Sequence, residues 1–505
     1  MSRLLSKLIT VAVLGVLTVT AAAQEPVLPS APDAQQGTPG DQADVKPEQD
    51  AGAGIWQRSD LLGDLGGLRS GLATTGVSFG LQETSEVLGN LGGGIRRAIV
   101  YEGVTQMGVG VDLEKAVGLA GGMLNVSGFQ IHGRGLSINA LDNNLHTVSG
   151  LEAPRGTLLF ELWYEQVLFE KVLAIRVGQL TADQEFMISQ YGYLFDNHTF
   201  GWSTLPSTDL PSSGPSYPLA TPGVRVRVLP HDDLAVLAAV FNGDPAGPGR
   251  GTPQQRNPDG TSFRLRDGIF AIAEIQYSLN ADDQATGLPG TYKFGAWYNS
   301  NSFADQRRTG LGASLAAFGS NVGAIPGQPR LRRGNWSIYT VADQLVWRRG
   351  DTKDQGVGVF TRLMGAPGDR NLINFYAEGG VTFKGAFDSR PADTAGIAVG
   401  YARISDTASK RDSDLRAQDG VTPIRRHETV LELTYQAQIV PWLQLQPYAQ
   451  YVFGLNGGVA NPLVPAKRLG DAGVLALRRR LPFKASDNPC SRGRRRCRTW
   501  LCLAY

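Results

Sequence analysis

Two glutamates and a tryptophan alternate along the segment at residues 161–166 (ELWYEQ), and they are the residues with the most evident chemistry. Side chains alternate faces along a strand, so Glu161, Trp163 and Glu165 share one face. A carboxylate pair could hydrolyse a glycoside as acid and base, but four residues at ~3.3 Å separate these two by ~13 Å. Hydrolytic pairs lie ~5 to 9.5 Å apart. Carboxylates beside an indole suit sugar binding instead, because hydroxyls need acceptors and sugar C–H faces stack on aromatic rings.

The remaining motifs with catalytic potential are incomplete. The five histidines include no HExxH pattern, and His427-Glu428 lacks a second histidine at the spacing that zinc requires. The glycine-rich runs at residues 92–94 and 108–110 match neither a phosphate loop nor a dinucleotide fingerprint. The sequence therefore indicates that the protein is not an enzyme.

Two-residue alternation recurs along the chain and identifies the elements that must position these side chains. At residues 292–299, Tyr292, Phe294 and Tyr298 face one way, and Lys293 and Trp297 face the other. About sixteen such segments lie between residues 77 and 483. Sheets with one apolar and one polar face, repeated this often, predict an all-β fold: a transmembrane antiparallel up-and-down barrel of about 16 strands with a wet interior. At residues 158–166, the same alternation places Leu158 and Phe160 on the lipid side.

The connectors between these segments alternate in length. Even-numbered connectors such as 167–172, 230–233 and 439–442 are short, whereas odd-numbered ones such as 134–157, 181–223, 243–267 and 301–335 are long. Bacterial outer-membrane barrels have short periplasmic turns and longer extracellular loops. The pattern predicts localisation in the bacterial outer membrane as a multi-pass barrel.

The chain ends divide into further segments. Residues 1–23 combine Arg3, Lys7, an apolar run and three alanines, which is typical of a secretory signal peptide. Residues 24–54 have too few large apolar side chains to fold, so we interpret them as a disordered linker. Leucines at helical spacing predict a short N-terminal helical segment at 55–72, and the barrel is expected at 73–483. Residues 484–505 form an anomalous basic tail.

Charge and cysteine content narrow the class of partner. The chain has 48 basic and 46 acidic residues. Without the signal peptide and the tail, 40 basic and 45 acidic residues remain, a net charge of −5, which argues against a nucleic-acid partner. All three cysteines lie in the tail. The body of the chain therefore has no thiol for a disulfide or a thiolate metal site.

Several motifs, in one order along the chain, resemble the carbohydrate-selective porin (OprB) family. They are residues 63–69 (GDLGGLR), 130–135 (QIHGRG), 161–166 (ELWYEQ), 177–180 (VGQL), 199–202 (TFGW), 217–218 (YP) and 222–225 (PGVR). The likeness covers about residues 55–483. It implies a 16-stranded outer-membrane barrel that passes monosaccharides such as glucose by facilitated diffusion, without a cofactor. A general, unselective diffusion porin on the same architecture is the alternative.

The strand phases also predict which side chains face the lumen, and the longest connector predicts a constriction. The expected lumen residues are Glu161, Trp163, Glu165, Arg176, Arg225, Arg227, Lys293, Trp297, Arg362 and Glu378. Matched arginines and glutamates could equally hold the wall together, and an inward tryptophan could pack beneath a loop. The connector at 181–223 is expected to fold inward as the constriction, or else to form a surface lid, and its candidate residues are Asp183, Glu185, Asp196, Asn197, His198 and Trp202. The expected partners are monosaccharides, outer-membrane lipid and lipopolysaccharide, and the barrel assembly machinery.

Overall fold

The computed structural model of the protein describes residues 54–58, 61–281, 285–318, 327–350, 352 and 355–483. The interpretations of residues 1–23 as a signal peptide, of 24–54 as a linker and of 484–505 as a tail concern segments that, apart from Gly54, lie outside the described residues. No helix in the described part of the chain is long and apolar enough to cross a membrane.

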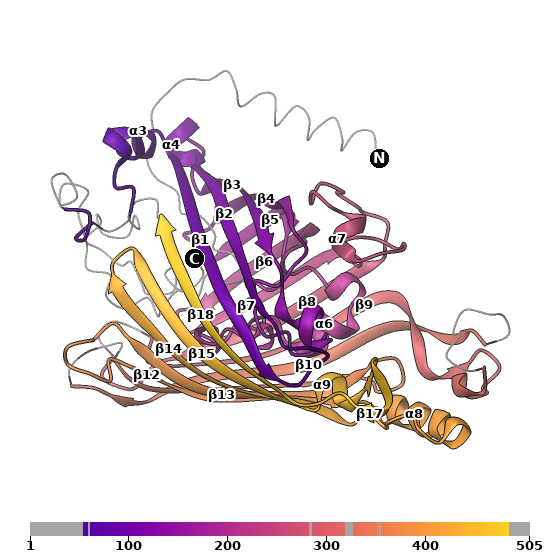
Figure 1. Ribbon diagram of the computed structural model, residues 1–505. Helices are drawn as coiled ribbons and strands as arrows, with labels where there is room; N and C mark the ends of the chain where they lie inside the picture. Colours follow the sequence, from indigo (N-terminus) through magenta and orange to yellow (C-terminus); the bar gives the residue numbers. More distant parts are fainter. Residues whose placement is uncertain are drawn as a thin grey trace.

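Sixteen antiparallel strands close into one barrel (Figure 1). Each strand pairs with its neighbours along the chain, and β1 closes the ring against β18, with Leu81 opposite Phe483. The predicted closed 16-stranded barrel is therefore confirmed. The strands are β1 (Val77–Gly92), β2 (Ile99–Asp112), β3 (Gly122–Gly133), β4 (Gly156–Leu168), β5 (Leu173–Leu180), β6 (Thr221–His231), β7 (Leu234–Asn242), β8 (Ile269–Leu279), β9 (Gly290–Thr309), β10 (Pro329–Arg348), β11 (Gly356–Gly365), β12 (Ile373–Lys384), β13 (Thr394–Ile404), β14 (His427–Val440), β15 (Leu443–Phe453) and β18 (Ala472–Phe483).

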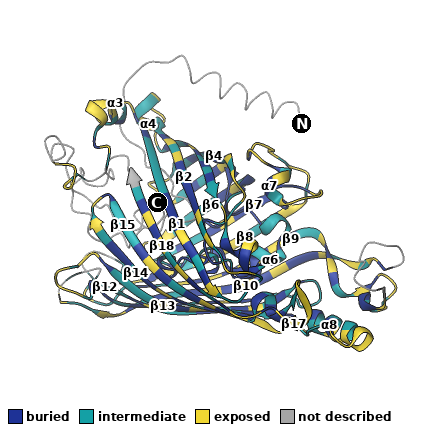
Figure 2. Ribbon diagram, viewed as in Figure 1, coloured by how far each residue is buried: buried dark blue, intermediate teal, exposed yellow. Residues whose placement is uncertain are grey.

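Burial alternates along the strands as the two-residue pattern predicts (Figure 2). On β9, Phe294 and Tyr298 are exposed on the outer wall, whereas Trp297 and Asn299 are buried on the inner face. An apolar outer wall and a polar inner wall are what a membrane-spanning barrel requires, since lipid replaces water on the outside.

The predicted phase of β4 is wrong at its first residues. Leu158 and Phe160 are buried on the inner face, where Phe160 packs against Phe129 with ring centroids 4.4 Å apart. The register between β3 and β4 shifts between Val126 and Gly128, where β4 carries one extra residue. This bulge reverses the alternation, so Glu161 follows Phe160 on the same inner face.

Several connectors at one end of the barrel are tight, and several at the other end carry structure of their own. The turns between β6 and β7 and between β14 and β15 consist of residues 232–233 and 441–442. At the opposite end, β9 and β10 extend beyond the predicted strand ends into the stretch expected as a loop, and α8 (Asp406–Asp419) and a hairpin of β16 (Ala460–Asn461) and β17 (Val464–Arg468) project there (Figure 1). The extensions and α8 are polar, so apolar periodicity gave no signal for them.

The N-terminal helix is shorter than predicted and begins later. A 3₁₀ turn, η2 (Leu65–Gly67), precedes α3 (Leu68–Thr74). Gly66 and Gly67 have φ values of 71° and 92°, which are outside the right-handed helical region, so a continuous helix cannot form across them. The segment lies at the end with the short turns, where the rings of Trp56 and Trp442 stack 5.7 Å apart.

Candidate functional site: the lumen and its inner loop

The connector between β5 and β6, residues 181–220, lies inside the barrel, and we call it the inner loop. Its backbone N–H of Met187 donates to Glu274 on β8 at 2.7 Å, and that of Asp196 donates to Glu432 on β14 at 2.7 Å. Its Ser189 hydroxyl donates to Asp343 on β10 at 2.6 Å. Carboxylates on widely separated strands therefore bind one loop, which spans the lumen.

Short helices give the inner loop its shape. They are η4 (Gly192–Leu194), α5 (His198–Gly201), α6 (Thr204–Asp209) and η5 (Pro211–Ser213). The Asn197 side chain caps α5 by accepting from the backbone N–H of Thr199, as asparagine commonly does at a helix N-terminus. At the end of α6, the Asp209 carboxylate accepts from the backbone N–H of Leu372 at 2.9 Å, which fixes α6 against the start of β12.

A second connector, residues 134–155, also enters the barrel, which the sequence did not predict. His146 Nδ1 lies 2.9 Å from a carboxylate oxygen of Glu428 on β14, and both side chains are fully buried. Gln450 on β15 donates to the carbonyl of Val148 at 2.8 Å, and the Ser149 hydroxyl donates to Glu86 on β1. Surface loops can have the same length and composition as this connector. Only its contacts with distant strands show that it lies inside the barrel.

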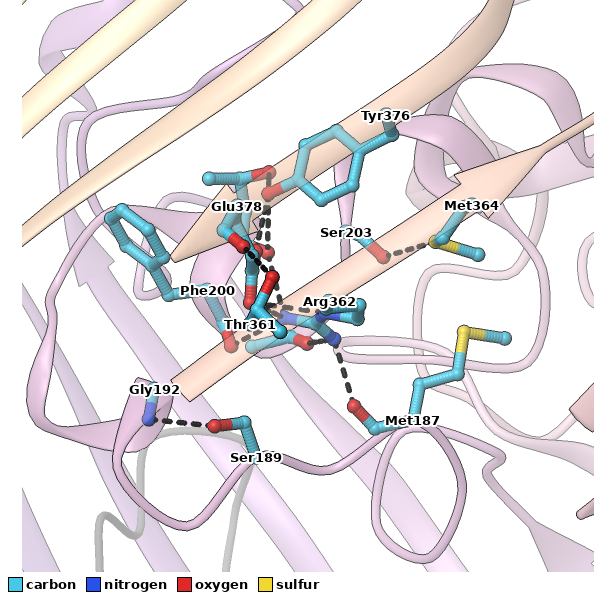
Figure 3. Close-up of polar contacts among 12 residues, drawn as sticks. Met187, Ser189, Gly192, Phe200, Ser203, Thr361, Arg362, Met364, Tyr376 and Glu378 are labelled. Carbon is cyan, nitrogen blue, oxygen red and sulfur yellow. Dashed lines mark hydrogen bonds and ion pairs between the residues drawn. The ribbon is translucent and has the colours of Figure 1, made fainter. Parts of the chain in front are cut away.

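Arg362 and Glu378 form a sealed cluster beneath the inner loop (Figure 3). The Arg362 Nη2 atom lies 2.6 Å from a Glu378 oxygen, and both side chains are 0% exposed. The same guanidinium donates to four loop carbonyls, those of Met187, Gly201, Thr199 and Phe200, at 2.8 to 3.2 Å. Both side chains are buried within the barrel. They hold the loop to β11 and β12 and lie away from the open lumen surface.

Glu165, Arg176, Glu185 and Arg225 form a second group, the lumen cluster. Arg176 lies 3.0 Å from Glu165 and 2.9 Å from Glu185, and Arg225 lies 2.7 and 2.6 Å from the same two carboxylates. The two arginines and two glutamates balance in charge. Burial acts to raise the pKa of Glu185, but the guanidinium groups of Arg225 and Arg176 hold that pKa below its ordinary value. Glu185 is ionised at neutral pH, and its side chain is 14% exposed.

The two predicted lumen tryptophans face inward but are covered. Trp163 is 1% exposed, with the Arg176 guanidinium 3.8 Å above its ring and its Nε1 donating to Glu161 at 3.1 Å. Trp297 is 2% exposed and packs against Phe270 with ring centroids 6.1 Å apart. Neither ring offers an open face on which a sugar could stack in this structure.

The predicted constriction residues divide between anchors and buried polar groups. Asp196 lies in an ion pair with Arg478 of β18, Asn197 donates to Gln450 at 3.0 Å, and the Trp202 indole donates to a loop carbonyl at 2.9 Å. Burial raises the pKa of Asp183 to about 7. Burial lowers the pKa of His198 to about 4, so this imidazole is neutral at pH 7.

A few other side chains of the strands and the inner loop keep some exposure to solvent. Among the predicted residues, Arg227 on β6 is half-buried, and Lys293 on β9 is 9% exposed. The inner loop adds Gln190, Tyr191 and Tyr193, which the sequence did not single out. Tyr193 donates to the carbonyl of Asp183 at 3.2 Å. These three residues lie in a connector that has no sequence periodicity, so the sequence could not indicate which way their side chains face.

Comparison with known proteins agrees with this architecture. A family model described as the carbohydrate-selective porin, OprB family, matches residues 96–483. The chain belongs to this family. Porin B of Pseudomonas aeruginosa is 24% identical to this OprB-family chain over 407 residues, which cover 78% of the chain and 86% of that protein. The putative porin QuiX of Acinetobacter baylyi is 22% identical over 454 residues, covering 84% and 93%.

A solved structure shows the same fold. The high-pH structure of Pseudomonas putida OprB superimposes on this OprB-family chain with a TM-score of 0.74 at 22% identity, covering 85% of this chain and all of that one. Family and fold assign the protein to the bacterial outer membrane and point to a channel rather than an enzyme. Among the described residues, no group of three or more His, Cys, Asp or Glu side chains is arranged to hold a metal ion.

Proposed function

We propose that the protein passes monosaccharides such as glucose across the outer membrane by passive diffusion, along a path narrowed by the inner loop. The observation that carries this proposal is the set of polar and aromatic side chains that remain partly exposed inside the ring. Glu185 supplies acceptors, Arg227 and Gln190 supply donors, and Tyr193 supplies an aromatic ring. A sugar needs each of these, because its hydroxyls donate and accept while its C–H faces are apolar.

Membership of a carbohydrate-selective porin family supports the same substrate class. Because both charge signs lie at the narrowing, a neutral solute meets no net electrostatic barrier, whereas an ion of either sign meets a repelling group. Further partners proposed for the protein are the lipid and lipopolysaccharide of the outer membrane and the assembly machinery that inserts barrels.

Block of ion current by sugar tests the selectivity. In planar bilayers, glucose is expected to reduce the current through the wild-type channel with saturable affinity. Tyr193→Ala removes a ring face from the narrowing, and stacking contributes ~0.5 to 1.5 kcal/mol, so block should weaken roughly two- to tenfold. Tyr298→Ala on the lipid-facing wall is the matched control and should leave block unchanged.

The general, unselective porin makes the opposite prediction. In that case glucose would barely affect the current, and the rate of liposome swelling would fall smoothly with solute size across glucose, xylose, maltose and amino acids. Equal weakening in the two tyrosine variants would also contradict a sugar contact at Tyr193.

A further inference from the structure

An apolar groove separates the N-terminal segment from the outer wall of the barrel. Its volume is about 510 Å³, within the range of ~300 to 1,000 Å³ common for small-molecule sites. Leu62 and Leu65 line one side, and outward residues of β1 and β2, among them Leu81, Met107 and Val109, line the other. Two apolar surfaces therefore face each other across a space that no side chain of the groove fills.

Water is a poor occupant of this groove. An ordered water needs two to four polar partners, and apart from Arg69 and Ser127 the side chains that line the groove are apolar. The side chains of Leu62, Leu65, Met107 and Val109 are 40 to 45% exposed, so the segment rests loosely above the wall. Because the groove is continuous with the lipid-facing outer wall of an outer-membrane barrel, the medium that reaches it is hydrocarbon.

The location of the groove selects the leaflet. The N-terminal segment lies at the end of the barrel with the tight turns, where Trp442 of the turn at residues 441–442 donates to the carbonyl of Ile55 at 2.7 Å. Figure 1 shows α3 at this end and α8 at the other. Short turns are periplasmic in outer-membrane barrels, so the groove opens to the periplasmic leaflet.

Arg69 adds a charged group to the lining. Its Nη1 atom donates to the carbonyl of Gly63 at 2.9 Å, which holds the guanidinium beside the groove. A guanidinium matches the geometry and charge of a phosphate better than any other side chain does.

We propose that this groove binds one acyl chain of a periplasmic-leaflet phospholipid, and that Arg69 contacts the phosphate of the same lipid. The bound chain fills the space between the N-terminal segment and the wall, and it holds that segment against β1 and β2. This site is on the outside of the barrel and is independent of any solute that crosses the lumen.

Native mass spectrometry of the full-length mature protein in detergent, with added palmitoyl-oleoyl phosphatidylglycerol, tests the proposal. The wild type should retain one phospholipid. Val109→Trp fills the groove from the wall and should reduce the lipid-bound fraction by about tenfold, since a filled pocket excludes the chain. Val224→Trp on β6 is the matched control, because both valines are 43% exposed on the outer wall. It should retain lipid as the wild type does.

A second variant tests the headgroup contact separately. Arg69→Gln should reduce retention of the phospholipid several-fold. The shift in gel mobility on heating verifies that each variant is a folded barrel, and unchanged ion conductance verifies that the lumen is intact. Equal retention by the two tryptophan variants would overturn the proposal, as would a wild type that keeps no lipid. Retention of lipopolysaccharide or free fatty acid in place of phospholipid would overturn the proposal that the bound acyl chain belongs to a phospholipid.

Discussion

The sealed cluster and the lumen cluster are built from the same residue types but differ in what covers them. Arg362 and Glu378 lie beneath the inner loop at 0% exposure, and four loop carbonyls complete the guanidinium's hydrogen bonds. In the lumen cluster, the carboxylate of Glu185 is itself part of the inner loop and remains 14% exposed. The loop therefore covers one cluster and contributes a water-facing charge to the other.

Because of this difference, the arginine–glutamate pairs of the two clusters have different roles. A buried guanidinium must satisfy every N–H group internally, so the sealed cluster is an anchor whose loss leaves a charge without a partner. The lumen cluster shares its charge over two arginines and two glutamates, so that each group has two partners. Loss of one group there should leave the others paired.

Arg362→Met should have the largest effect on stability. It leaves Glu378 buried without its partner and frees four loop carbonyls, and breaking a buried pair costs about 3 to 5 kcal/mol. The midpoint of urea unfolding in detergent should fall accordingly, and liposomes should swell faster in maltose because the loop is released. The double variant Arg362→Met with Glu378→Met should recover the part of the loss that comes from the unpaired carboxylate. A midpoint equal to that of the wild type would show that the cluster does not anchor the loop.

Arg176→Met makes the same substitution in the lumen cluster and should cost less. Arg225 remains 2.7 and 2.6 Å from Glu165 and Glu185, so neither carboxylate is left without a cation. The variant loses charged hydrogen bonds, which contribute ~1.5 to 3 kcal/mol to the free energy of unfolding. It also loses the contact of the Arg176 guanidinium with the Trp163 ring. If this variant destabilised the protein as much as Arg362→Met, the distinction between the two clusters would fail.

The sequence predicted the barrel well because alternation is a property of every membrane-facing strand. Apolar side chains such as Val109 and Phe294 lie on the outer wall, so a period of two along the sequence indicates both the number of strands and which face of each strand points outward. It could not predict the bulge before Glu161, because one inserted residue leaves no mark on composition. It also named Arg362 and Arg225 as equivalent lumen residues. Their difference depends on the path of the inner loop, which is set by contacts between residues 150 or more apart along the chain.

Glu185→Gln should change permeation more than stability. Both arginines stay paired with Glu165 when Glu185 is replaced, so the cost to folding should not exceed the ~1.5 to 3 kcal/mol of a charged hydrogen bond. The substitution removes one negative charge at the narrowing and leaves both arginines, so anion selectivity should increase in reversal-potential measurements. Glucose block should weaken about tenfold if the carboxylate accepts from a sugar hydroxyl. Glu114→Gln in the turn between β2 and β3 is a control that should alter neither property.

Asp183→Asn should change stability least at neutral pH and should give a shallower dependence of stability on pH. Burial raises the pKa of Asp183 from 3.8 to about 7, so the folded protein keeps this proton after the unfolded chain has lost it. The stability that this proton contributes is present in full below pH 3.8 and is lost as pH rises towards 7. We expect the melting temperature in detergent, measured from pH 4 to 8, to depend on pH more steeply in the wild type than in the variant below pH 7. Above pH 7 the two curves should have the same slope.

The comparison between the two proteins isolates Asp183 from other titrating groups of the loops. Burial raises the pKa of Glu152 to about 7 as well, which adds to the same trend, whereas burial lowers the pKa of His198 to about 4, which opposes it. Both groups are present in the wild type and in Asp183→Asn, so their contributions cancel in the difference between the two curves. Parallel curves over the whole range would mean that Asp183 ionises alike in the folded and unfolded chains. The backbone N–H of Tyr217, which donates to this carboxyl at 2.8 Å, would then hold an ordinary carboxylate, and the start of the inner loop would be open to water.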